Sequence, residues 1–189
     1  MVDYAKLFLK CKTDKEDARH KYGNIYSFVI SSLVAKAQRK LNVLEIGMWE
    51  GDSLCAWGQS GDFDKIVAVD IDDKIRPENR QQIAGYNCDI HIRNAYDTET
   101  VNFLKEKYGS FDLIVDDGSH FIGHQLFFLE KYHDLLSGGG VLICEDVFLV
   151  NVPEITRRAD LNPYVIDLLQ NETFKAPQFN DSILVLRIK

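Results

Sequence analysis

Apolar and polar positions along the chain follow two repeating patterns. Short runs rich in Val, Ile and Leu are typical of buried strands, and apolar residues three or four positions apart are typical of helices. The first pattern predicts strands at residues 42–47, 65–71, 88–92, 111–115 and 141–144. The second predicts helices at residues 26–39, 53–59, 98–107, 121–136 and 164–170. Residues 173–188 are predicted to form two further strands joined through Asn180 and Asp181.

This alternation of strands and helices predicts an α/β fold with a doubly wound, mostly parallel sheet and helices on both faces. The sequence contains no internal repeat, no low-complexity tract and no interior linker. We therefore expect a single domain over residues 1–189. Within it, residues 1–40 form a helical N-terminal preface, able to act as a lid over the functional site, and residues 41–189 form the core.

Composition excludes several classes of protein. A net charge of −7 and a pI near 5.2 argue against nucleic acid as a partner, because nucleic-acid-binding proteins usually carry a basic patch. The four cysteines form no CxxC pair and no zinc or disulfide pattern, which is typical of reduced thiols in the cytosol. No apolar stretch reaches about 18 residues and no signal sequence is present, so we expect a cytoplasmic protein without a membrane partner.

Two apolar runs end in adjacent carboxylates. IVDDGSH spans residues 114–120, and GGGVLICED spans residues 138–146. If the two strands are parallel neighbours, their acids converge at one edge of the sheet, where they repel one another unless a positive charge lies among them. Asp117, Glu145 and Asp146 would supply oxygen ligands for a hard divalent cation such as Mg²⁺ or Mn²⁺.

His120 lies three residues after Asp117 and is a candidate for proton transfer, although orienting a ligand or capping the next helix are alternatives. Asp116 is a candidate for the cofactor site, with a supporting role or a helix cap as alternatives. His124, one helical turn after His120, could face the same site but is more typical of a surface or supporting residue.

The first predicted strand ends in LEIGMWEGDS, residues 44–53. Glycine at a strand-to-helix turn lets the backbone pass close to a ligand, and Asp70 at the end of the second strand can accept hydrogen bonds from ribose hydroxyls. Met48 and Trp49 stand where the dinucleotide pattern GxGxxG has its second glycine, so a nucleoside cofactor without a pyrophosphate is favoured. The candidate cofactor residues are Glu45, Gly47, Gly51, Ser53, Asp70, Asn94, Ala95 and Asp116.

Residues 42–189 resemble the class I methyltransferases that use S-adenosylmethionine (SAM). Their first motif is similar to the ExGxxxG pattern formed by Glu45, Gly47 and Gly51, and Asp70 resembles the acid that holds the ribose. The resemblance implies a Rossmann-like fold with a seven-stranded, mostly parallel sheet and an antiparallel last strand. It also implies that the adenine lies near Asn94 and Ala95, after the third strand.

A sharper resemblance is to the metal-dependent sugar O-methyltransferases of the macrocin and mycinamicin type and to related cephalosporin-tailoring methyltransferase-like proteins. It rests on four blocks, which are Thr13-Asp14-Lys15 with His20, Tyr22 and Tyr26, LEIGMWEGDSL, DDGSH with Gln125, and GGGVLICED. It implies that Asp117, Glu145 and Asp146 bind the metal and that His120 is a candidate base. The spacing of these residues is also similar to that of catechol O-methyltransferase, which has a lysine in the place of the histidine.

Together these patterns predict SAM-dependent, divalent-metal-dependent methyl transfer to a hydroxyl of a sugar or glycoside. The alternatives are a catechol-like or other small-molecule diol as acceptor, and a non-catalytic SAM-binding domain. The sequence also leaves open a homo-oligomer and a place within a larger multidomain glycan-synthesis protein.

Overall fold

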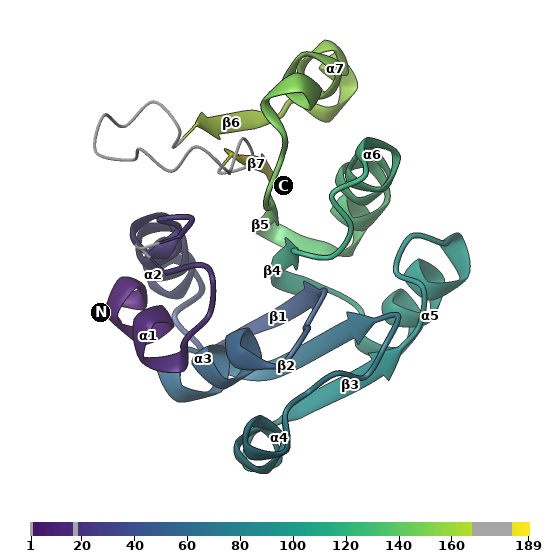
Figure 1. The fold of residues 1–189 in the computed structure, drawn as a ribbon. Helices are drawn as coiled ribbons and strands as arrows, with labels where there is room; N and C mark the ends of the chain where they lie inside the picture. The colour runs from purple at the N-terminus through teal and green to yellow at the C-terminus, as the bar shows by residue number, and fades with distance from the viewer. Residues whose placement is uncertain (1, 17–18, 168–182) are drawn as a thin grey trace.

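The computed structural model describes residues 2–16, 19–167 and 183–189, and these residues build a central sheet flanked by helices (Figure 1). Its strands are β1 (Leu41–Ile46), β2 (Phe63–Asp70), β3 (Cys88–Ile92), β4 (Phe111–Asp116), β5 (Leu136–Cys144), β6 (Tyr164–Asp167) and β7 (Ile183–Ile188). Its α-helices are α1 (Tyr4–Cys11), α2 (Gly23–Ala37), α3 (Asp52–Ser60), α4 (Pro77–Ile83), α5 (Thr98–Tyr108), α6 (Ile122–Lys131) and α7 (Val152–Arg157). Short 3₁₀ helices span Tyr132–Leu135, Leu149–Asn151 and Ala159–Leu161.

The strands lie in the order β3-β2-β1-β4-β5-β7-β6. All neighbouring pairs from β3 to β5 are parallel, and β7 runs antiparallel to both β5 and β6. The strand order reverses between β1 and β4, and ligands of such sheets bind in the crevice beyond the carboxyl ends at this point. The register pairs Ile46 with Asp116 and Asp116 with Cys144, so the segments that follow β1, β4 and β5 start side by side.

Each face of the sheet packs on its own set of helices. Alternate residues of β1 show this, because Val43 belongs to the cluster that includes α1, α2 and α3, and Leu44 belongs to the cluster that includes α5, α6 and α7. The predicted α/β fold, with helices on both faces and one antiparallel strand at the end, is confirmed.

The helix predicted at residues 164–170 is wrong in its described part, because Tyr164–Asp167 is strand β6. Val165 packs against one core cluster and Ile166 against the other, which is the period of two that a strand requires. The residues predicted as the first strand of the 173–188 pair lie outside the described part of the chain, whereas β7 is confirmed. Helices α1, α4 and α7 were not predicted as separate elements.

Cys55 and Cys144 are buried, Cys11 and Cys88 are half-buried, and all four are free thiols. No helix in the described part of the chain is long and apolar enough to span a membrane. The expectation of a single domain stays a prediction.

Candidate active site

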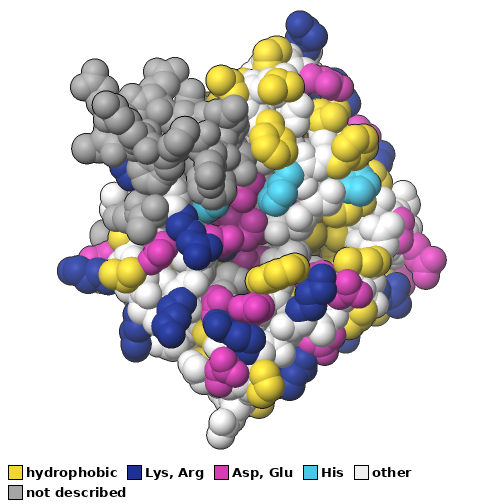
Figure 2. All heavy atoms as spheres, viewed as in Figure 1, with side chains coloured by type: hydrophobic (Ala, Val, Ile, Leu, Met, Phe, Trp, Pro, Cys, Tyr) yellow, Lys and Arg dark blue, Asp and Glu magenta, His cyan; other side chains and the backbone are white. Residues whose placement is uncertain are grey.

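The acids predicted to converge do so at the carboxyl edge of the sheet. Asp117 follows β4, and its backbone N–H donates to the carbonyl of Ile46 at the end of β1, with an N···O distance of 2.8 Å. The N–H of Glu145 donates to the carbonyl of Asp116, at 2.9 Å. These two bonds extend the strand pairing by one residue, which fixes the chain where the carboxylates begin. Figure 2 shows acidic side chains gathered at the centre of the same face of the molecule, with a histidine beside them.

The positive charge that lies among these acids comes from Lys15, between α1 and α2. Its Nζ is 2.5 Å from Asp117 Oδ2, 2.5 Å from Glu145 Oε2 and 3.6 Å from Glu45 Oε1. Burial opposes the charged form of Lys15, whose side chain is only 1% exposed, but Asp117 and Glu145 outweigh it and hold its pKa well above the usual value. The ammonium is therefore charged at neutral pH.

Two tyrosines reach the same acids from the start of α2. The Tyr26 hydroxyl donates to Glu145 Oε1, and the Tyr22 hydroxyl donates to Asp146 Oδ1 at 2.6 Å. His20 Nδ1 lies 3.4 Å from the same oxygen of Asp146. The segment before β1 thus supplies a polar partner to every carboxylate of the predicted metal site.

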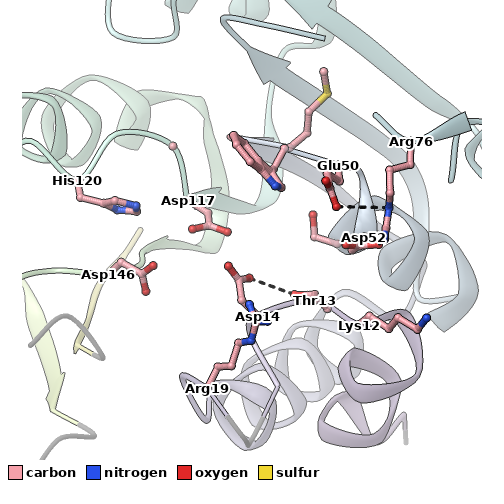
Figure 3. Close-up of a pocket in the computed structure, with 15 residues that line it drawn as sticks. Lys12, Thr13, Asp14, Arg19, Glu50, Asp52, Arg76, Asp117, His120 and Asp146 are labelled. Atoms are coloured by element: carbon pink, nitrogen blue, oxygen red, sulfur yellow. Dashed lines mark hydrogen bonds and ion pairs between the residues drawn. The ribbon is translucent and has the colours of Figure 1, made fainter. Parts of the chain in front are cut away.

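A cavity of about 580 Å³ opens beside this acid set. Asp117, His120 and Asp146 point into it from the edge of the sheet, and Asp14 faces them from the N-terminal segment (Figure 3). Arg19 lies beside Asp14, and the other side of the cavity carries Asp52 and the cations Lys12 and Arg76. An acceptor bound here would meet an imidazole and carboxylates at one end.

A second cavity of about 360 Å³ adjoins the first and contains the residues predicted to hold a nucleoside. Asp70, Asn94 and Ala95 line it, as does His124, whose ring stacks on Tyr96 with the centroids 4.2 Å apart. His124 therefore faces this cavity, whereas His120 faces the other. Volumes of this size are typical of small-molecule sites.

The turn after β1 separates the two cavities. Gly47 has a φ of +81°, and a Cβ placed on it would come within 2.2 Å of the Asp117 carbonyl oxygen, so only glycine fits between the turn and the segment after β4. Trp49 also has a positive φ, of 41°, and the backbone N–H groups of Met48 and Trp49 donate to Asp70 Oδ2 at 2.8 and 3.2 Å. The residues shared by both cavities are Gly47, Trp49, Asp117 and Gly118.

Comparison with protein families matches residues 44–147 to the family described as a methyltransferase domain. That match covers more than half of the chain, runs from within β1 to just beyond β5, and includes the residues that line both cavities. The chain belongs to the methyltransferase domain family.

Named relatives of this methyltransferase domain agree with the resemblance to the macrocin and mycinamicin type. It is 27% identical over 133 residues to mycinamicin VI 2''-O-methyltransferase of Micromonospora griseorubida, which covers 65% of this chain and 31% of that protein. It is 29% identical over 121 residues to demethylmacrocin O-methyltransferase of Streptomyces fradiae, which covers 60% of this chain and 29% of that protein. The chain thus spans about a third of the length of these relatives.

Among solved structures, the fold is similar to that of the MycE methyltransferase from the mycinamycin biosynthetic pathway, in complex with Mg and SAH. The TM-score is 0.72 at 18% identity, over 99% of this chain and 55% of that chain. The predicted class I methyltransferase fold is confirmed, and the match includes the N-terminal helices.

Several predicted cofactor residues of this methyltransferase lie behind the cavities. Glu45 is fully buried, and its Oε2 accepts hydrogen bonds from Ser53 Oγ at 2.8 Å and Trp57 Nε1 at 2.9 Å. Asp116 accepts a hydrogen bond from the Tyr96 hydroxyl at 2.6 Å. Burial raises the pKa of each of these two carboxyl groups to about 7. Ser53 lines the larger cavity, whereas Glu45, Asp116 and Gly51 line neither, and their direct contact with a cofactor stays a prediction.

The predicted metal ligands Asp117, Glu145 and Asp146 are close together, but their oxygens accept hydrogen bonds from Lys15, Tyr26 and Tyr22. In the part of the chain that the structure describes, no three His, Cys, Asp or Glu side chains are arranged to hold a metal ion. The donor set nevertheless fits a hard cation in its chemistry, because Asp117 and Glu145 already hold an ammonium ion between them. Metal binding by Asp117, Glu145 and Asp146 stays a prediction.

The contact of Lys15, Tyr22 and Tyr26 with the acids was not predicted. The only signal for it was the block that contains these residues, which resembles the sugar O-methyltransferases; no pattern of apolar residues indicates it. Tyr96 and Trp57, which hold Asp116 and Glu45, were not identified either, because a buried aromatic residue is more often part of the core.

Proposed function

We propose that this chain is a SAM-dependent O-methyltransferase that acts on a hydroxyl of a sugar or glycoside. The observation that carries the proposal is the pair of adjoining cavities. One holds the residues suited to a nucleoside, the other holds His120 among carboxylates, and Asp117 and Gly118 lie between them. A methyl donor in the first cavity would therefore end where an acceptor in the second begins.

SAM fits the smaller cavity in chemistry. Asp70 lies beside Asn94 and Ala95, where its carboxylate can accept hydrogen bonds from ribose hydroxyls. The same carboxylate fixes the turn after β1, because its Oδ2 accepts hydrogen bonds from the N–H groups of Met48 and Trp49. Gly47 and Asp117 line both cavities, so a methionine portion that extends from the ribose along them would end beside the acids. When bound, SAM supplies an electrophilic methyl group on a sulfonium.

His120 is the proposed base. Its ring points into the larger cavity beside Asp117 and Asp146, where a ring nitrogen can accept the proton of an acceptor hydroxyl (Figure 3). Asp14, across the cavity, is placed to accept a hydrogen bond from a second hydroxyl of the acceptor.

A divalent cation, Mg²⁺ or Mn²⁺, is part of the proposal, with Asp117, Glu145 and Asp146 as its ligands. When bound, it would lower the pKa of the acceptor hydroxyl and orient it. The names of the relatives support a sugar as the acceptor, because mycinamicin VI 2''-O-methyltransferase and L-olivosyl-oleandolide 3-O-methyltransferase carry a sugar position or a sugar in their names. The structure of the MycE methyltransferase contains Mg, which supports the metal.

The test is methyl transfer from labelled SAM to a panel of rhamnosides and catechols, with and without Mg²⁺ or Mn²⁺. His120→Ala is expected to lower the rate by about 10²–10⁴-fold on the preferred acceptor, the range typical of general-base catalysis. His133→Gln, outside both cavities, is the matched control and should keep the wild-type rate. Catechols preferred over rhamnosides would contradict the sugar, full activity of His120→Ala would contradict the base, and no transfer to any acceptor by wild type would favour a non-catalytic SAM-binding domain.

A further inference from the structure

Lys15 is held in its place by its own segment as well as by the acids. Its backbone N–H donates to Thr13 Oγ1 at 3.1 Å, and the Thr13 N–H donates to the Phe8 carbonyl at the end of α1. Thr13 is buried, and Phe8 belongs to the main core. The backbone of Lys15 is therefore fixed by hydrogen bonds to a buried part of the N-terminal segment.

Lys15 neutralises only part of the charge around it. Glu45, Asp117 and Glu145 face its ammonium, and Asp146 follows Glu145 directly. Asp117 and Glu145 thus share one ammonium group, and the carboxyl group of Asp146 is next in the chain, so a cation of higher charge would be attracted to the same place.

We propose that Lys15 is a positioning residue that occupies, with its ammonium group, the place between Asp117 and Glu145 that a divalent cation would take, and that the cation displaces it. This inference rests on the metal part of the proposed function. If the cation displaces the ammonium group, the side chain of Lys15 moves away from Asp117 and Glu145 when the metal binds.

The oxygens that the two cations would need are the same. Lys15 Nζ is 2.5 Å from Asp117 Oδ2 and from Glu145 Oε2, while Glu145 Oε1 is engaged by Tyr26. Bond lengths from Mg²⁺ to oxygen are about 2.0–2.1 Å, so a metal bound to both carboxylates would lie almost where Nζ lies. A dication and an ammonium at such a short separation repel strongly in a buried site. If the dication replaces the ammonium group of Lys15, this repulsion is avoided and both carboxylates still have a cationic partner.

The first test compares Mn²⁺ affinity, measured by electron paramagnetic resonance and calorimetry, between wild type and Lys15→Met. Lys15→Met is expected to bind Mn²⁺ at least tenfold more tightly, because the competing cation is gone. Lys10→Met, which removes an exposed lysine of α1, is the matched control and should bind Mn²⁺ as wild type does. An affinity in Lys15→Met that equals or falls below that of wild type would overturn the proposal, as would the failure of wild type to bind Mn²⁺.

The second test uses the wild-type protein, so it does not depend on the folding of a variant. Lysine acetylation followed by mass spectrometry should leave Lys15 unmodified without metal, since its side chain is 1% exposed, and should modify it when Mn²⁺ is added. Lys10 should be modified equally in both states. Continued protection of Lys15 with Mn²⁺ bound would overturn the displacement. Neither readout requires methyl transfer, so a failure here is separate from a failure of the proposed function.

Discussion

The hydrogen bond from Tyr26 to Glu145 predicts a specific loss of stability. Tyr26→Phe removes one hydroxyl from a fully buried site, creates almost no cavity and leaves Glu145 Oε1 without this donor. Hydrogen bonds to charged groups contribute about 1.5–3 kcal/mol, and a buried acceptor left without a partner costs a similar amount. We therefore expect the free energy of unfolding to fall by about 1.5–3 kcal/mol, which lowers the melting temperature by roughly 3–12 °C for a chain of this size.

Urea denaturation of wild type and two variants gives the measurement. Tyr108→Phe is the matched control, because the Tyr108 hydroxyl also donates to a carboxylate, Asp89 Oδ2 at 2.8 Å, but in a partly exposed place where water can replace it. Its expected cost is below about 1 kcal/mol. Equal losses in Tyr26→Phe and Tyr108→Phe, or no loss in either, would refute the argument that burial of the acid set makes the N-terminal donors important.

Two further predictions concern the turn after β1 and the acid behind it. The folded protein keeps the proton of Glu45 up to about pH 7, whereas the unfolded chain releases it near 4.5, so wild type should lose stability relative to Glu45→Gln as the pH rises between these values. The change in the relative free energy of unfolding should reach roughly 3 kcal/mol at most. Thermal or urea unfolding of both proteins at several pH values measures it, and a difference that does not vary with pH would contradict the prediction. Trp49 is 64% exposed and lines both cavities, whereas Trp57 is fully buried, so S-adenosylhomocysteine should change tryptophan emission in wild type but not in Trp49→Phe. Calorimetry should show that Trp49→Phe still binds this ligand, and a persistent emission change in the variant would contradict the assignment.

The strands and the acids at their ends could be predicted because both signals are local. β4 and β5 are apolar runs that stop at carboxylates, and the alternation with helices makes these strands parallel neighbours. Burial in a parallel sheet requires such continuous apolar runs, so the sequence must show them. The acids therefore had to appear together at one edge of the sheet.

The partners of those acids could not be predicted in the same way. Lys15 is 102 residues from Asp117 and 130 residues from Glu145, and a single lysine in a polar segment is usually exposed. Strand β6 shows a related limit, since Tyr164–Asp167 is too short for its period of two to be distinguished from a helical stripe. In both cases the decisive contacts come from distant parts of the chain.

The position of the N-terminal helices decides how the site should be probed. Tyr4 and Phe8 of α1 are fully buried, and both rings contact the ring of Trp57, which itself donates to Glu45. Removing α1 together with the residues that follow it as far as Lys15 would open the core beside Glu45 and take away the ammonium group, so a truncated chain would lose stability and site geometry together. Single substitutions separate these effects, because Lys15→Met changes the charge at the acids while the aromatic contacts of α1 stay in place. A ligand that binds at the acids would therefore affect the N-terminal segment through Lys15, which contacts Asp117 and Glu145.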